Sequence, residues 1–184
     1  MRHMTRSLLL LLLIGALPSC AGEVIPEEFS RGRAIPFGSH TVTVFRVQPN
    51  QLGDVMILSV HLRIDPKGGG DAPLDKKWVD YLRKVKLTDG TGKQHRAVGV
   101  MPAAIQHAQQ RIMASGDPDA YARIVLEQGR KLEEMYSSGN LPLEWDEWIL
   151  VYNVSKDAKP FTLYLKNPDP KDDQPRAAIV RVYR

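Results

Sequence analysis

Residues 55–64 read Val55-Met56-Ile57-Leu58-Ser59-Val60-His61-Leu62-Arg63-Ile64, and this stretch decides the fold. Successive side chains of a β-strand point to opposite faces. Five aliphatic side chains then share one face: Met56, Leu58, Val60, Leu62 and Ile64. The other face turns polar through Ser59, His61 and Arg63, which is typical of a strand whose back is partly open to solvent. We therefore predict a central strand of an antiparallel β-sandwich.

Other segments supply the remaining strands. β-branched and aromatic content or alternation predicts four more of them: Thr41–Val47, Trp148–Val154, Phe161–Leu165 and Ala177–Tyr183. Pro49–Gly53 is expected to form the turn into the central strand. Tyr81–Thr88 and Gln94–Val100 are expected to form a hairpin around Asp89-Gly90-Thr91-Gly92. The sequence thus predicts a mainly β domain.

A helical period interrupts these strands at about residues 102–138. Pro102 suits the first helical turn, and apolar residues recur at helical spacing up to Ser115-Gly116. A second helix is predicted from Asp117-Pro118-Asp119 to about Ser138. Its expected buried stripe is Tyr121, Ile124, Val125, Leu132 and Met135. This two-helix insertion is where we expect a specialised function.

The amino terminus carries a secretion signal. Arg2 and Arg6 precede the apolar run Leu8–Ile14, which is too short for a spanning helix. Leu17-Pro18-Ser19-Cys20 follows and resembles the lipobox of bacterial lipoproteins. That resemblance implies a diacylglycerol on the Cys20 thiol and cleavage before it, and Ala21 after the cysteine implies the outer membrane. Ordinary cleavage after Ala21, giving a periplasmic or secreted protein, remains the alternative.

These features divide the chain into three parts. We expect a lipoprotein signal peptide at 1–19, a lipidated cysteine and tether at 20–34, and a β-sandwich domain at 35–184. The tether would reach at most roughly 50 Å when extended. Cys20 is the single cysteine, so the mature domain forms no internal disulfide and has no cysteine nucleophile. The fold must rest on packing.

Charge and motif content exclude several function classes. Without Arg2 and Arg6, 23 basic residues remain against 21 acidic ones, so nucleic-acid binding is not expected. Asp65 and Asp71 lack calcium-loop spacing, and Lys171 and prolines interrupt the cluster of Asp169, Asp172 and Asp173. We therefore expect no metal ion and no cofactor. The mature histidines are scattered singly, and no serine lies in a nucleophile-elbow pattern. We therefore expect no enzyme, although folding would still be able to assemble a hydrolase triad.

The order of segments resembles a known class of domain. The strands above, with the turn Asp89-Gly90-Thr91-Gly92 and the later Ala158-Lys159-Pro160, resemble secreted immunoglobulin-like domains of unknown function found on bacterial lipoproteins. This resemblance implies an immunoglobulin-like β-sandwich and an envelope location, but no catalytic residues. The helical insertion departs from the pattern.

The sequence favours a binding role over catalysis. We expect a membrane-anchored cell-envelope lipoprotein that contacts another envelope protein through the insertion and nearby strand edges. A binder of small molecules or glycans is the alternative, and a concave pocket lined by Trp78 or Trp145 would distinguish it. The candidate binding residues are Trp78, Trp145, Tyr121 and Tyr136.

Overall fold

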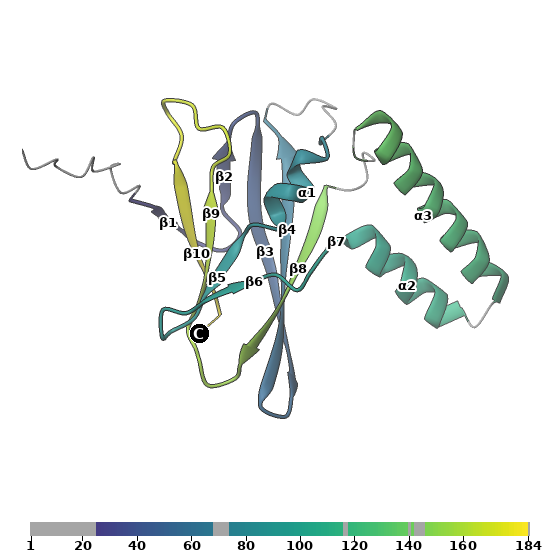
Figure 1. The fold of residues 1–184 in the computed structure, drawn as a ribbon, viewed down its shortest axis with the longest axis horizontal. Helices are drawn as coiled ribbons and strands as arrows, with labels where there is room; N and C mark the ends of the chain where they lie inside the picture. The colour runs from purple at the N-terminus through teal and green to yellow at the C-terminus, as the bar shows by residue number, and fades with distance from the viewer. Residues whose placement is uncertain (1–24, 68–73, 116–117, 140, 142–145, 184) are drawn as a thin grey trace, which may run out of the picture.

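The computed structural model describes residues 25–67, 74–115, 118–139, 141 and 146–183 (Figure 1). Within these residues, two five-stranded sheets form a β-sandwich. The first sheet has the order β1-β10-β9-β5-β6 and the second β2-β3-β4-β8-β7. The first sheet comprises β1 Glu27–Phe29, β5 Lys86–Thr88, β6 Gln94–Arg96, β9 Phe161–Lys166 and β10 Ala177–Tyr183. The second comprises β2 Ala34–Phe37, β3 His40–Leu52, β4 Val55–Pro66, β7 Gly99–Pro102 and β8 Glu147–Ser155.

The predicted central strand is confirmed. β4 lies in the middle of the second sheet, paired antiparallel with β3 on one side and β8 on the other. Its five predicted inward residues are at most 3% exposed. Because alternate residues of a strand share a face, this row of aliphatic side chains meets the core-facing residues of the first sheet, such as Leu163 and Leu165. The predicted β-sandwich is therefore correct.

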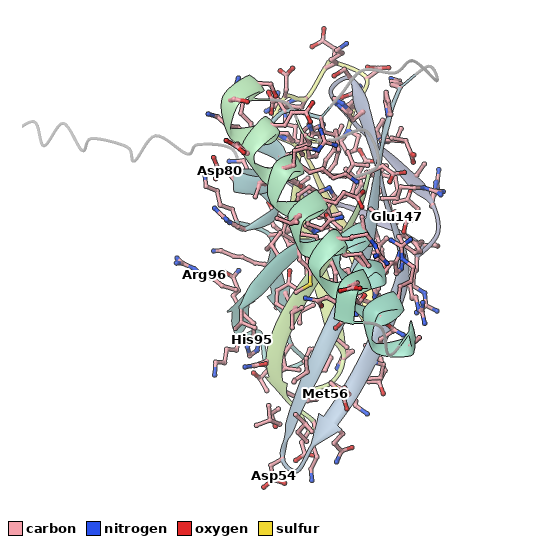
Figure 2. All side chains as sticks on the ribbon, turned by 90° about the vertical axis from the view of Figure 1, so that its right-hand side faces the viewer. Asp54, Met56, Asp80, His95, Arg96 and Glu147 are labelled. Carbon is pink, nitrogen blue, oxygen red and sulfur yellow. The ribbon has the colours of Figure 1, made fainter. Side chains whose placement is uncertain are left out.

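The predicted helical insertion is also present, as α2 (Ala103–Ser115) and α3 (Pro118–Ser138). Both helices lie beside the second sheet (Figure 1). α2 contacts β7 and β8, and its Ala108 is buried. The outward residue His61 is only 5% exposed, although we expected that side of β4 to be partly open. Figure 2, in which the insertion faces the viewer, shows α3 in front of the sheet.

Two predicted strand boundaries are wrong. β3 continues through Pro49, which pairs with Leu58, and the turn lies at Gly53 and Asp54. The predicted strand 81–88 is instead the short helix α1 (Lys77–Leu82) followed by β5. The reason is that Trp78 and Leu82, one helical turn apart, are both buried.

Other predictions need smaller corrections. The predicted strand 94–100 divides into β6, which pairs in the first sheet, and β7, which pairs with β8 in the second. The segment predicted as a tether contains β1, which pairs in parallel with β10, and the start of β2. The ordered domain therefore begins before residue 35, and the sheets are not wholly antiparallel. In the described residues, no helix combines the length and apolar character that a bilayer crossing needs.

Candidate functional site

The candidate site lies at the end of the sandwich that carries α1. Three segments meet there: α1, the β2–β3 turn at Gly38 and Ser39, and the loop between β9 and β10. Gln174 fixes the loop to the turn, because its Oε1 accepts the Gly38 N–H at 2.7 Å and its Nε2 donates to the Gly38 carbonyl at 2.9 Å. In Figure 2, Asp80 of α1 lies in the upper half of the molecule and Asp54 of the β3–β4 turn at its lower tip.

Aromatic rings form the floor of this end. The Trp78 ring meets the His40 ring edge-on at 5.2 Å and the Tyr81 ring at 5.4 Å between centroids. Tyr81 in turn meets Phe37 edge-on at 6.4 Å. Such edge-to-face pairs are a favoured aromatic geometry. Because α1 places Trp78 and Tyr81 three residues apart, both rings turn toward the β2–β3 turn, and the floor is held by contacts on several sides.

Two adjoining clefts open over this floor. The lysine cleft has a volume of about 660 Å³ and the histidine cleft about 450 Å³. The lysine cleft is lined by Lys77, Asp80, Tyr81, Lys84, Val85, Lys86, Gln94, Tyr164, Lys166, Asn167 and Pro168. The histidine cleft is lined by Phe37, Gly38, Ser39, His40, Asp75, Lys77, Trp78, Tyr81, Pro168 and Asp169. Lys77, Tyr81 and Pro168 belong to both, so the clefts are neighbours.

Two buried polar atoms in these walls lack hydrogen-bond partners. Within the described part of the chain, neither His40 Nε2 nor the Tyr81 hydroxyl has one. The other ring nitrogen of His40, Nδ1, lies 3.1 Å from Ser39 Oγ. Burial lowers the pKa of His40, against a smaller opposing effect of Asp75, and burial raises the pKa of Tyr81. Both groups are therefore neutral at pH 7. Each of the two atoms is itself covered by protein, so a ligand in the clefts reaches it only when a neighbouring side chain moves.

The charges differ between the two clefts. The lysine cleft is lined by four lysines and one carboxylate, Asp80. The histidine cleft instead holds the carboxylates Asp75 and Asp169 with the shared Lys77. The site is thus positive on one side of Tyr81 and carries more carboxylates on the other. A ligand that spans both clefts would meet opposite electrostatic environments at its two ends.

The predicted site residues are only partly placed by the structure. Trp78 lines the histidine cleft from the helix α1 and is 8% exposed. Trp145 and Cys20 lie outside the described residues. Tyr121 and Tyr136 belong to α3, far along the chain from the clefts, and their side chains are not described.

Sequence reasoning missed His40 and Tyr81. The spacing Trp78-x-x-Tyr81 was the available signal, because two aromatic residues three apart share a face of a helix. It was not used, since Tyr81 was assigned to a strand. Nothing in the local sequence around His40 indicates that its ring would meet Trp78, because that contact depends on how β3 and α1 pack.

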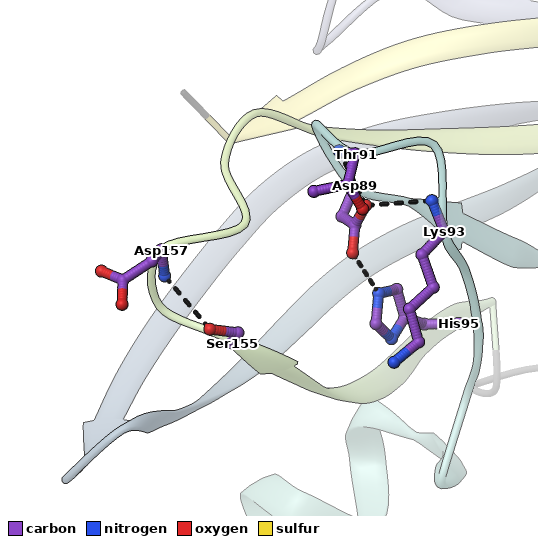
Figure 3. A network of polar contacts seen from close by, with 6 residues as sticks. All are labelled: Asp89, Thr91, Lys93, His95, Ser155 and Asp157. Atoms are coloured by element: carbon purple, nitrogen blue, oxygen red, sulfur yellow. Dashed lines mark hydrogen bonds and ion pairs between the residues drawn. The ribbon is translucent and has the colours of Figure 1, made fainter.

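A second polar cluster, around Asp89, serves the fold (Figure 3). Asp89 Oδ1 accepts the Thr91 N–H, the Thr91 hydroxyl and the Lys93 N–H, at 2.9, 2.6 and 3.0 Å. Its Oδ2 lies 2.8 Å from His95 Nε2. Hydrogen bonds from Thr91 and His95 hold the pKa of Asp89 well below its usual range. These bonds close the β5–β6 turn and leave the carboxylate no free oxygen for a substrate.

The described histidines and acidic side chains do not form the clusters that a hydrolase or a metal site needs. His40 bonds a serine and His95 a carboxylate, but no histidine among the described residues is hydrogen-bonded to both. The geometry of a hydrolase triad is therefore not formed by these residues. In the same part of the chain, no three His, Cys, Asp or Glu side chains gather as metal ligands would.

Comparisons with known proteins bear on architecture alone. No protein-family model matches the sequence, and no curated protein does. Among solved structures, the chain is similar to an uncharacterized beta-sandwich protein from Clostridium difficile 630, with 10% identity over 87% of this chain and 96% of that one and a TM-score of 0.47. It is also similar to the yjhA protein from Bacillus subtilis, with 10% identity over 83% of this chain and 98% of that one and a TM-score of 0.38.

Proposed function

We propose that this chain is a lipid-anchored protein of the cell envelope that binds a small molecule in the two joined clefts and catalyses no reaction. One observation carries the binding role: Trp78 lines a concave cleft in whose walls two buried polar atoms, His40 Nε2 and the Tyr81 hydroxyl, have no partner among the described residues. Small-molecule sites typically combine aromatic walls with a few such polar groups.

The energetic argument is that a ligand would satisfy groups that folding left unsatisfied. A buried donor or acceptor without a partner costs about 1–3 kcal/mol. A ligand that hydrogen-bonds Tyr81 or His40 recovers part of that cost on binding, and clefts of several hundred Å³ leave it room. The raised pKa of Tyr81 keeps its proton on the phenol at pH 7, and the neutral Tyr81 and His40 side chains can both hydrogen-bond a ligand.

The binding role is tested by a thermal-shift screen of the full chain in detergent. The panel contains an aromatic acid, an aromatic alcohol, an aromatic amine and a simple sugar, and at least one member should raise the melting temperature. Tyr81→Phe should weaken that response. Tyr183→Phe, the same chemical change outside both clefts, should leave it intact. A panel without any response, or a response that Tyr81→Phe leaves unchanged, contradicts the proposal.

The anchor rests on the lipobox and has its own test. Cys20 lies outside the described residues, so the resemblance of Leu17-Pro18-Ser19-Cys20 is its support. Several acyl chains bind a bilayer stably, since each buried methylene contributes about 0.8 kcal/mol. Mass spectrometry should find an acylated Cys20 at the mature amino terminus, and Cys20→Ser should move the protein to the soluble fraction. A soluble, unmodified protein beginning at Gly22 would show ordinary cleavage instead.

A protein partner bound through the insertion is the second candidate function. The observation that favours it is Leu126, whose side chain is 74% exposed on α3. α3 packs on α2, and the exposed Leu126 gives its outer side an apolar contact for a partner. Proteins crosslinked to the chain in the envelope should be lost when residues 103–137 are deleted and reduced by Leu126→Asp. An unchanged set of crosslinked proteins, with the variants still folded, counts against this role.

A further inference from the structure

Positive charge is concentrated on one side of the candidate site. Lys77, Lys84, Lys86 and Lys166 all line the lysine cleft, and they come from α1, the segment after it, β5 and β9. The whole chain carries a formal charge of only +4, with basic and acidic residues mixed along it. Four ammonium groups around a single cleft are therefore a local feature that the fold creates.

The carboxylates nearby neutralise only part of this charge, because Lys77 Nζ lies 4.0 Å from Asp75 Oδ2 but the other three lysines have no carboxylate partner among the described residues. Asp80 lines the lysine cleft, but its Oδ1 lies 3.8 Å from an Arg83 guanidinium nitrogen, so its charge is shared with a residue outside the lining. Lys86 Nζ donates to the amide oxygen of Gln94 at 2.8 Å, which is a neutral partner. Lys84 and Lys166 form no ion pair within the described residues. Like charges held around one cleft repel each other, and an anion would remove that repulsion.

The remaining walls of the lysine cleft suit an apolar body. Val85 is buried, and the rings of Tyr81, Tyr164 and Pro168 line the cleft beside it, with the amides of Gln94 and Asn167 as the remaining polar groups. The Tyr81 hydroxyl is the buried donor without a partner in the described structure. Its pKa is raised by burial, so it keeps its proton and can donate it to an oxygen anion.

On the basis of the proposed function, we propose that the ligand is a small anion in which a carboxylate or phosphate group is attached to an aromatic or aliphatic body. The acidic group lies among Lys77, Lys84, Lys86 and Lys166 and accepts a hydrogen bond from the Tyr81 hydroxyl. The body packs on the aromatic floor.

The neighbouring cleft fixes the orientation of the ligand. Asp75 and Asp169 line the histidine cleft and would repel a second anionic group. His40 Nε2 offers a neutral polar contact there. The acidic end of the ligand therefore lies in the lysine cleft, and any part that reaches the histidine cleft is neutral or basic.

Four benzene derivatives of similar size test the charge preference. Benzoate and phenyl phosphate carry the proposed anionic groups, benzyl alcohol is neutral and benzylamine is cationic. Dissociation constants are measured by calorimetry on the full chain in detergent. At least one anion should bind about tenfold more tightly than benzyl alcohol, and added salt should reduce the difference. Comparison of benzoate with phenyl phosphate identifies the acidic group.

Lysine variants place the binding in the cleft. Lys84→Gln with Lys166→Gln removes two cleft lysines whose side chains have neither an ion pair nor a hydrogen bond among the described residues. Both side chains are exposed, so the fold should persist. This double variant should lose most of the preference for anions and keep the affinity for benzyl alcohol. Lys76→Gln with Lys93→Gln is the matched control, because both lysines are exposed and neither lines a cleft. Circular dichroism confirms folding.

The outcomes separate the two proposals. Equal binding of benzyl alcohol and the anions, or a preference for benzylamine, overturns the anionic ligand while the binding role stands. A preference for anions that persists in the double variant Lys84→Gln, Lys166→Gln shows that these lysines do not bind the acidic group, and it overturns the placement of the anion in the lysine cleft. If no compound binds in calorimetry and none raises the melting temperature in the thermal-shift screen, both proposals are overturned.

Discussion

Replacing Tyr81 with phenylalanine should stabilise the ligand-free protein while weakening ligand binding. The substitution keeps the ring, which contacts Trp78 and Phe37 edge-on, and removes only the hydroxyl. That hydroxyl is buried without a partner in the described structure. Most single substitutions of buried residues are destabilising, so a gain in stability at this position is a specific expectation.

The magnitude follows from the hydrogen-bond inventory. An unsatisfied buried polar group costs about 1–3 kcal/mol, so its removal should raise the free energy of unfolding by about 1 kcal/mol or more. Tyr152 gives the matched comparison, because it is fully buried and its hydroxyl donates to the Val85 carbonyl at 3.3 Å. Tyr152→Phe leaves that carbonyl unpaired by the side chain and should lower the free energy of unfolding by about 0.5–1.5 kcal/mol.

Urea denaturation of both variants, followed by circular dichroism, measures these changes. The two substitutions remove the same atom from buried tyrosines, so opposite signs isolate the effect of the hydrogen-bond partner. A Tyr81→Phe variant that is less stable than the wild type refutes the reasoning, because the hydroxyl must then have a good partner such as an ordered water. Without an available hydroxyl at Tyr81, the argument for a ligand contact there would also fail.

Three further predictions concern the fold. Gly90→Ala should lower the free energy of unfolding by about 1–3 kcal/mol, because the added Cβ would collide with the Lys159 carbonyl. Gly129→Ala should raise the free energy of unfolding by up to about 1 kcal/mol, because nothing lies within 4 Å of the added Cβ. Urea denaturation of the two variants measures both changes. The ionised carboxylate of Asp89, whose pKa is lowered in the fold, stabilises the protein above the pKa of an unfolded aspartate, which is about 4. The difference in stability between wild type and Asp89→Asn should therefore shrink as the pH is lowered below about 4, as acid denaturation would measure. Burial, with Arg46, lowers the pKa of His61, so stability should fall as the pH drops through the unfolded value of about 6.5, and thermal unfolding of His61→Gln should depend less on pH.

The sequence predicted those parts of the fold whose pattern is local and long. Residues 55–64 alternate over ten positions, and the matching face is buried in β4. The Asp-Gly turn was recognisable because its geometry is set within a few residues, and Asp89 does close that turn. The insertion was recognised because its period of 3.6 persists through α2 and α3.

The parts that failed are short or depend on distant pairing. α1 has six residues, too few for a helical period to be distinguished from alternation, and the burial of Trp78 and Leu82 is visible only after folding. β1 has three residues and pairs with β10 at the other end of the chain. No local pattern in Glu27–Phe29 specifies that parallel pair, because the partner strand supplies it.

The candidate site could not be read from the sequence for the same reason. Its walls come from the β2–β3 turn, α1, β5 and the end of β9, which are separated by up to about 130 of the chain's 184 residues. Trp78 was a candidate because of its residue type alone. His40, Tyr81 and the four lysines of the lysine cleft acquire their shared position only from the packing of the two sheets and α1.

Packing alone does not account for the residues at this end. Trp78 and Leu82 of α1 are buried, and they close the open end of the core as folding requires. Phenylalanine at position 81 would contact Trp78 in the same way without burying a hydroxyl that has no partner in the described structure. Lysines at 84 and 166 likewise add charge to a cleft that needs none for stability. Both features lower the stability of the ligand-free protein. An anion bound among the lysines that accepts a hydrogen bond from the Tyr81 hydroxyl would turn both features into favourable contacts.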